Sequence, residues 1–200
     1  MTNTILFKTM YVILSYLLGS VCFGYVFARK LGKKDFGKND LPGAAGSYRQ
    51  LGKIGITIGI LDTLKGVIPP LLARLVGLDT YTLAAACLAV VIGHNWPVYH
   101  RFRGGGGLTV VIGISIVIIP LEFAIAFVTA ILGGYIYKYT LRKRFKAPPI
   151  PVGGAIGTFL LPILTLLFGK SLPVIFLFTC LFLIIAIKGI ILTNIYKFQS

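Results

Sequence analysis

The chain has 200 residues, of which 56% are hydrophobic and 12% charged, with a mean hydropathy of +0.90 and a formal net charge of +15. This balance excludes an ordinary soluble domain and indicates an integral membrane protein. The basic residues lie in short loops between apolar runs, where they set topology and meet anionic headgroups. We therefore expect one polytopic membrane domain over residues 1–200, with membrane lipids and no nucleic acid as partners. The isolated cysteines have no metal-ligand spacing, so we expect no metal and no cofactor.

Apolar runs of about 20 residues, at about 1.5 Å each, can cross the bilayer as helices. The sequence predicts an all-α integral membrane fold with seven transmembrane helices, at residues 5–28, 54–75, 81–93, 108–119, 121–137, 152–168 and 172–192. The fourth run is short because Pro120 and Glu122 follow it, so we expect the glycines before it to dip into the protein. In the first run, small residues at helical spacing predict an inward face: Ser15, Gly19, Ser20 and Gly24.

The distribution of cations predicts the orientation. Fifteen lysines and arginines lie in the segments 29–53, 99–107, 138–151 and 196–200, and only three lie in the segments between the other span ends. By the positive-inside rule the N-terminus is outside and the C-terminus is cytoplasmic. Both glycine-containing loops, before residues 54 and 108, then face the cytoplasm.

Two of these cytoplasmic loops have the composition of anion sites. In the second, Arg103 precedes the run Gly104–Gly107, whose backbone N–H groups could approach a phosphate at the start of a helix. In the first, Gly43 and Arg49 form a second candidate cradle. The alternative is that both are solvated turns whose arginines serve only topology.

The second span carries two charges, Asp62 and Lys65, three positions apart on one helical face. Each charge in a span costs about 2.5 to 3.5 kcal/mol, so the two should pair and face protein or water. They either line a polar cavity or form a structural bridge beside the site, and the second role is favoured. Replacing Asp62 is expected to harm the protein more than replacing Lys65. Pro69 and Pro70 are expected to kink or end this helix.

These motifs resemble the bacterial acyl-phosphate:glycerol-3-phosphate acyltransferases over most of the chain. The matching stretches are Gly19-Ser20-Val21-Cys22-Phe23-Gly24, Pro42-Gly43-Ala44 with Arg49, Leu61-Asp62-Thr63-Leu64-Lys65-Gly66, and Gly93-His94-Asn95-Trp96-Pro97-Val98 with Phe102-Arg103-Gly104-Gly105. The resemblance implies a multi-pass protein of the bacterial cell membrane, with seven spans and a site facing the cytoplasm.

The chain departs from the family pattern at three motifs. The first family motif, GSGN-x-GATN, lacks its serine and both asparagines here, where Lys38 to Leu41 and Gly43 to Gly46 stand. In the second motif, GGKG, Gly106 occupies the lysine position. The third, an HR-x-NI-like segment after the last span, has no counterpart among Lys188 to Ser200.

The resemblance implies transfer of an acyl group from acyl phosphate to glycerol 3-phosphate, giving lysophosphatidic acid for phospholipid synthesis. Two anions held adjacent need no covalent nucleophile. The phosphate-binding residues would be Arg49, Arg103, Gly104, Gly105 and Gly107, supported by Gly43, Asp62, Lys65 and Asn95. No catalytic residue is assigned, although His94 is a candidate proton acceptor or a loop-fixing hydrogen bonder.

Two other functions compete with the enzyme. A non-catalytic homologue would keep the fold and bind phospholipid or a protein partner, which the missing motif residues favour. A small-anion transporter is disfavoured because the sequence has no inverted repeat and no paired broken spans.

Overall fold

The structure is a computed structural model that describes residues 5–33, 35–38, 40–145 and 149–195. All regular elements in these ranges are helices, as the sequence predicted. The chain divides into two compact units, Met1–Ile118 and Ile119–Ser200, and each is described by itself.

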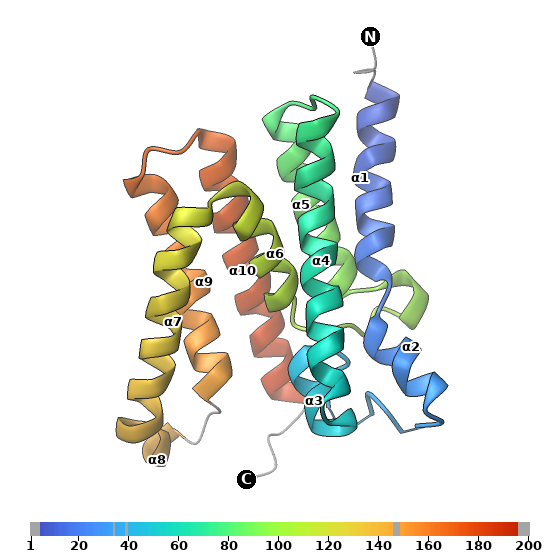
Figure 1. The fold of residues 1–200 in the computed structure, drawn as a ribbon, viewed down its shortest axis with the longest axis vertical. Coiled ribbons are helices and arrows are strands. Elements are labelled where there is room, and N and C mark those ends of the chain that lie inside the picture. The colour runs from blue at the N-terminus through green and yellow to red at the C-terminus, as the bar shows by residue number, and fades with distance from the viewer. Residues whose placement is uncertain (1–4, 34, 39, 146–148, 196–200) are drawn as a thin grey trace. The chain divides into compact units, whose positions relative to one another are not determined.

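The N-terminal unit places four long or apolar helices in two packed pairs (Figure 1). Helix α1 packs against α5, and α4 packs against α6. Glycines permit both pairs to approach at backbone distance, because a side chain at Gly19 or Gly66 would collide with the carbonyl group of Val90 or Val110, respectively. The elements are α1 (Ile5–Ser20), α2 (Phe23–Lys30), α3 (Ala44–Leu51), α4 (Ile54–Leu75), α5 (Thr80–Asn95), the 3₁₀ turn η1 (Val98–His100) and α6 (Leu108–Ile118).

The first span is not one continuous helix, which corrects the expectation for residues 5–28. Helix α1 ends at Ser20, Cys22 has an extended backbone, and α2 begins at Phe23 in a new direction (Figure 1). The interruption leaves carbonyl groups near the end of α1 without helical partners, and these become ligands of a buried lysine. The predicted inward face is confirmed, since Ser15, Gly19, Ser20 and Gly24 are buried.

The prolines of the second span do not end its helix, which was one of the two outcomes predicted from the sequence. Helix α4 continues through Pro69 and Pro70 to Leu75. Both prolines are buried, and the hydroxyl of Tyr11 donates to the carbonyl oxygen of Pro69 at 2.5 Å. This hydrogen bond ties α4 to α1 at the level of the two prolines.

The C-terminal unit comprises α7 (Pro120–Thr140), α8 (Arg142–Phe145), α9 (Pro149–Leu167) and α10 (Leu172–Ile195). Helix α9 packs against both α7 and α10. Pro120 begins α7 rather than interrupting a span, and the buried Glu122 pairs with Lys170 at 2.8 Å. This pair joins the start of α7 to the connection between α9 and α10.

Six segments in the described residues are long and apolar enough to cross a membrane. Helix α6 is apolar but shorter, at 11 residues, as its sequence predicted. The expectation that the preceding glycines dip into the protein is confirmed, because Gly104, Gly105 and Gly107 are buried. The predicted cytoplasmic tail, Tyr196 to Ser200, lies outside the described residues.

Candidate functional site

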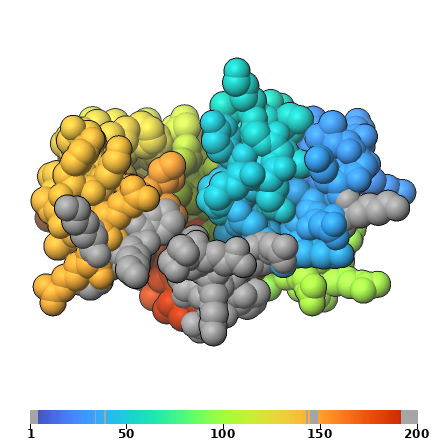
Figure 2. Space-filling model, turned by 90° about the horizontal axis from the view of Figure 1, so that it is seen from below, coloured from blue at the N-terminus to red at the C-terminus, as the bar shows by residue number. Residues whose placement is uncertain are grey.

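The structure brings the two glycine-containing loops together. A side chain on Gly43 would lie only 3.3 Å from the Cα atom of Gly105 and 3.6 Å from the nitrogen of Gly106. These residues are more than 60 positions apart in the sequence, so only the fold makes them neighbours. Figure 2 shows the molecule from below, where the first loop and α3, in blue to cyan, make up much of the visible face of the N-terminal unit. The segment after α5, in light green, lies at the edge of this face. The two candidate cradles are therefore parts of one surface.

Two helices begin at this contact. Gly43 is the N-cap residue of α3, and the glycine run leads directly into α6, where Gly107 has a φ of +84° and accepts from the N–H of Val111. The first N–H groups of a helix have no partner within it, and the helix dipole is positive at that end. Two such N-termini beside each other form a surface suited to a phosphate group.

The glycines of the second loop have different tasks. The N–H of Gly105 donates to the carbonyl oxygen of His94 at 3.1 Å. This N–H group is therefore not available to a phosphate, contrary to the role that the sequence predicted for Gly105. Within the described residues, the N–H groups of Gly106 and Gly107 have no protein acceptor. A side chain on Gly104 would collide with the backbone of His94, whereas one on Gly106 would meet nothing within 4 Å. Gly106 also lacks a left-handed φ, so a larger residue fits there.

His94 is a buried support of the glycine turn. Its ring Nε2 lies so close to Gly105 that an added Cβ atom would collide with it. Its Nδ1 is 3.4 Å from the ammonium of Lys65 and 3.7 Å from the carboxylate of Asp62. A ring held between an ion pair and a backbone turn is placed to fix that turn.

The intramembrane charges form the buried pair that their spacing predicted. Lys65 Nζ lies 2.9 Å from Asp62 Oδ1, and each side chain is only 2% exposed. The ammonium also donates to the carbonyl oxygens of Val21 at 2.6 Å and Gly19 at 3.3 Å. It lies 5.1 Å from the centroid of the Phe23 ring. Lys65 therefore ties the break between α1 and α2 to α4 and, through His94, to the glycine turn.

The expected support residue Asn95 is also placed beside this turn. It is fully buried at the end of α5, and its backbone carbonyl lies where a side chain on Gly104 would be. Like His94, it leaves no room for any residue but glycine at position 104. The first two glycines of the run, Gly104 and Gly105, are thus held by α5.

Arg49 lies on α3, the helix that begins after Gly43, and its side chain already holds an anion. Its Nε and Nη2 atoms donate to the two carboxylate oxygens of Asp40 at 2.6 and 2.7 Å. These bonds raise the pKa of the Arg49 guanidinium. From the sequence, Asp40 was predicted to be only one of the charges of the loop. Two residues nine positions apart across a turn show no pattern that predicts their contact. Arg103, the other expected phosphate ligand, is exposed.

An aromatic cluster holds the two loops against each other and had no signal in the sequence. The ring of Tyr25 stacks on His100, with centroids 4.5 Å apart, and meets Phe36 edge-on at 5.5 Å. Beyond His100, Arg101 and Phe102 adopt left-handed backbone angles, with φ of 52° and 60°. Such angles are costly for residues with side chains and mark a turn fixed by its surroundings.

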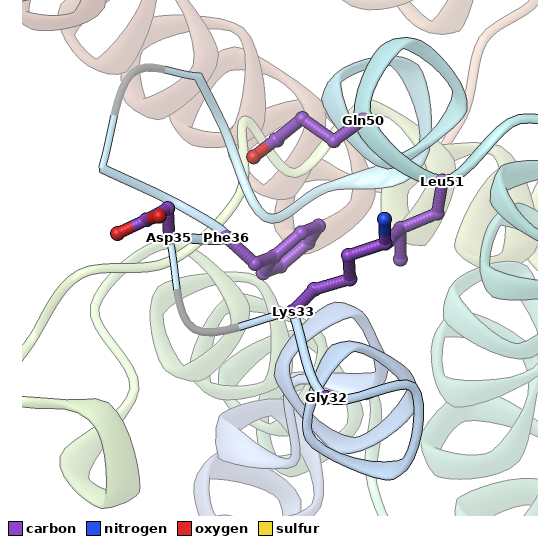
Figure 3. A pocket seen from close by; sticks show the side chains of 6 residues that line it. All are labelled: Gly32, Lys33, Asp35, Phe36, Gln50 and Leu51. Carbon is purple, nitrogen blue, oxygen red and sulfur yellow. The ribbon is translucent and has the colours of Figure 1, made fainter.

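A cavity of about 480 Å³ opens behind the first loop (Figure 3). It is lined by Gly32, Lys33, Asp35, Phe36, Gln50 and Leu51, none of which was expected at the site. The amide of Gln50 accepts from the N–H of Gly37 and donates to the carbonyls of Leu41 and Gly46. Gln50 thus closes the loop onto α3 and fixes the path of the chain towards Gly43.

Comparisons with known proteins agree on one family. The sequence model of that family, described as glycerol-3-phosphate acyltransferase, matches residues 9–196. A glycerol-3-phosphate acyltransferase of Halalkalibacterium halodurans is 42% identical over 126 residues, which are 60% of this chain and 61% of the relative. Glycerol-3-phosphate acyltransferase 2 of Deinococcus radiodurans is 38% identical over 150 residues, 72% of this chain and 75% of the relative. The first of these alignments therefore spans less than two thirds of the curated relative.

A solved structure extends the likeness to nearly the whole chain. It is the crystal structure of PlsY (YgiH), an integral membrane glycerol 3-phosphate acyltransferase, in its glycerol 3-phosphate form. The two chains superpose with a TM-score of 0.80 and 29% identity, covering 94% of this chain and 90% of the other. The lysophosphatidic acid form of the same protein superposes with a TM-score of 0.76.

The contacts of the buried pair predict a different order of harm from the one that the spacing of the two charges predicted. Lys65→Met leaves the Asp62 carboxylate and two backbone carbonyls without their donor, whereas Asp62→Asn leaves the ammonium on those carbonyls. We expect Lys65→Met to lower the free energy of unfolding by about 3 to 5 kcal/mol and Asp62→Asn by less. Thermal unfolding of purified protein in detergent measures both. Lys8→Met is the control, since it removes an exposed pair with Asp79 and should cost about 1 kcal/mol or less.

Gly105→Ala tests whether the turn is held by His94. The added methyl group collides with the His94 ring, so the melting temperature should fall by several degrees. Gly106→Ala, one residue away in open space, should leave it almost unchanged. Equal melting temperatures for the two variants would mean that the turn is not packed as described.

Proposed function

Because this chain belongs to the glycerol-3-phosphate acyltransferase family, we propose that it transfers an acyl group from acyl phosphate to glycerol 3-phosphate. The product is lysophosphatidic acid, an intermediate of phospholipid synthesis. The observation that carries this proposal is the contact between Gly43 and the Gly105–Gly106 backbone, which places two helix N-termini at one surface. Such a surface suits a reaction in which both substrates carry phosphate groups.

The chemistry needs alignment more than a reactive side chain. The 1-hydroxyl oxygen of glycerol 3-phosphate forms a bond to the acyl carbonyl carbon, and the bond from that carbon to the phosphate oxygen breaks. Phosphate leaves with the electron pair, and the hydroxyl proton passes to phosphate or water. Backbone donors at Gly106 and Gly107, together with Arg49 and Arg103, would hold the phosphate groups and stabilise the developing charge. His94 acts as a positioning residue, because it is buried beneath the glycine turn.

The proposed location is the bacterial cytoplasmic membrane, with seven spans and the site facing the cytoplasm. The cation distribution supports this topology, since the loops that carry Gly43 and Gly105 belong to the basic set. For α6, 11 residues rise only about 16 Å, so a full crossing requires the buried glycine run before it to lie within the membrane.

The rival function is that of a non-catalytic homologue that binds phospholipid or a protein partner. Two observations favour it: glycine at position 106, where the family motif has lysine, and the carboxylate of Asp40 on Arg49. The surface would then retain its backbone donors while lacking the charge needed for turnover. Activity measurements separate the two functions.

We expect purified protein in lipid to convert glycerol 3-phosphate and an acyl phosphate to lysophosphatidic acid. Gly106→Lys should raise this activity by about tenfold to a few hundredfold, because a charge-assisted hydrogen bond contributes roughly 1.5 to 3 kcal/mol. A Cβ atom added at Gly106 meets nothing within 4 Å, so the start of the side chain enters open space. Gly106→Ala is the matched control, since it alters the backbone equally without adding charge. Absence of acyl transfer from acyl phosphate, acyl-CoA and acyl carrier protein alike, in both the wild type and Gly106→Lys, would contradict the enzyme and favour the non-catalytic homologue.

The crossing by α6 can be tested with a single pair of cysteines. Tyr99 precedes α6 and Tyr139 ends α7, and both are exposed, at 56% and 64%. If α6 spans the membrane, Tyr99→Cys and Tyr139→Cys lie on the same, cytoplasmic side, and a membrane-impermeant thiol reagent labels both only after permeabilisation. If α6 does not span, the reagent reaches one of the two in intact cells.

A further inference from the structure

The guanidinium of Arg49 is engaged on one edge by a carboxylate from its own chain. Asp40 meets the Nε and Nη2 atoms with both oxygens, and Asp40 Oδ1 also accepts from the N–H of Leu41 at 2.7 Å. The side chain of Arg49 is 46% exposed and that of Asp40 is 23% exposed. The pair is therefore accessible to an incoming solute.

Local packing holds Asp40 in this place. Gln50, adjacent to Arg49 on α3, hydrogen-bonds to the chain on both sides of Asp40, at Gly37 and Leu41. The loop is thus folded back onto the helix that carries Arg49. The carboxylate is presented by the fold and does not depend on a long, freely rotating side chain.

A carboxylate and a phosphate offer a guanidinium the same arrangement of two oxygens. One edge of Arg49 cannot hold both. We propose that Asp40 is a built-in competitor for the phosphate of the substrate at Arg49. A phosphate that binds through Nε and Nη2 must displace Asp40. A phosphate that binds through the other edge still meets the negative charge of Asp40 close by, so both routes weaken its binding.

This inference rests on the proposed function, in which Arg49 is a phosphate ligand, and it concerns affinity. Asp40 lowers the affinity of the site for glycerol 3-phosphate and also for the inorganic phosphate that the reaction releases. The second effect favours departure of a product that would otherwise occupy the same cationic group.

The test is Asp40→Asn, which keeps the size of the side chain and an oxygen for the Leu41 N–H but removes the charge. We expect the dissociation constants for inorganic phosphate and glycerol 3-phosphate, measured by calorimetry on the purified full chain, to fall about two- to fivefold, the upper part of the range of an exposed ion pair. The matched control is Asp35→Asn, since Asp35 pairs with Lys38 at 2.6 Å in the same loop. It should change either constant less than twofold. In the double variant that combines Arg49→Ala with Asp40→Asn, the tighter binding of phosphate should be lost.

Weaker or unchanged phosphate binding by Asp40→Asn would overturn the inference, as would the absence of measurable binding in every variant. Asp40→Ser, with melting temperatures for both, excludes misfolding as the cause of a loss. The proposed function fails separately. If Asp40→Asn binds phosphate more tightly but no variant transfers an acyl group, the competitor stands and the enzyme does not.

Discussion

The N-terminal unit depends on how the ammonium of Lys65 is satisfied inside the membrane. A buried cation is stable only with a full set of partners, and here these come from three elements: Asp62 on its own helix, the carbonyls of Gly19 and Val21 at the break in the first span, and the ring of Phe23. The break in the helix and the buried charge are therefore one feature. An unbroken α1–α2 helix would keep those carbonyl oxygens for itself.

The same arrangement fixes the glycine turn. His94 lies between the ion pair and Gly105, and its carbonyl oxygen accepts from the Gly105 N–H. Gly43 then packs on the turn and begins α3 there. A chain of contacts thus runs from the centre of α4 to the backbone of the two glycine-containing loops. Preorganised backbone donors are suited to binding charge because they need not reorder when a ligand arrives.

The sequence predicted the features that follow from helical periodicity and from the free energy of placing a charge in the membrane. Charges three apart in an apolar run had to pair, small residues at helical spacing had to face inward, and a short run before Pro120 required the glycines to be buried. It did not predict contacts set by tertiary structure. The acceptors of Lys65 arise from a helix break, and the meeting of Gly43 with Gly105 arises from the packing of two distant loops. Asp40 reaches Arg49 across a turn that the hydrogen bonds of Gln50 close.

Gly106 differs from its neighbours in what its replacement would disturb. Gly104 and Gly105 are confined by His94, and Gly107 requires a left-handed backbone, so exchanges there damage the fold first. At position 106 the surroundings are empty and the backbone is ordinary. Mutation and selection can therefore exchange a neutral residue for a charged one at this point in a single step, in either direction, without loss of the folded protein. At this one position, the charge of the turn can change without a change in how the turn is packed.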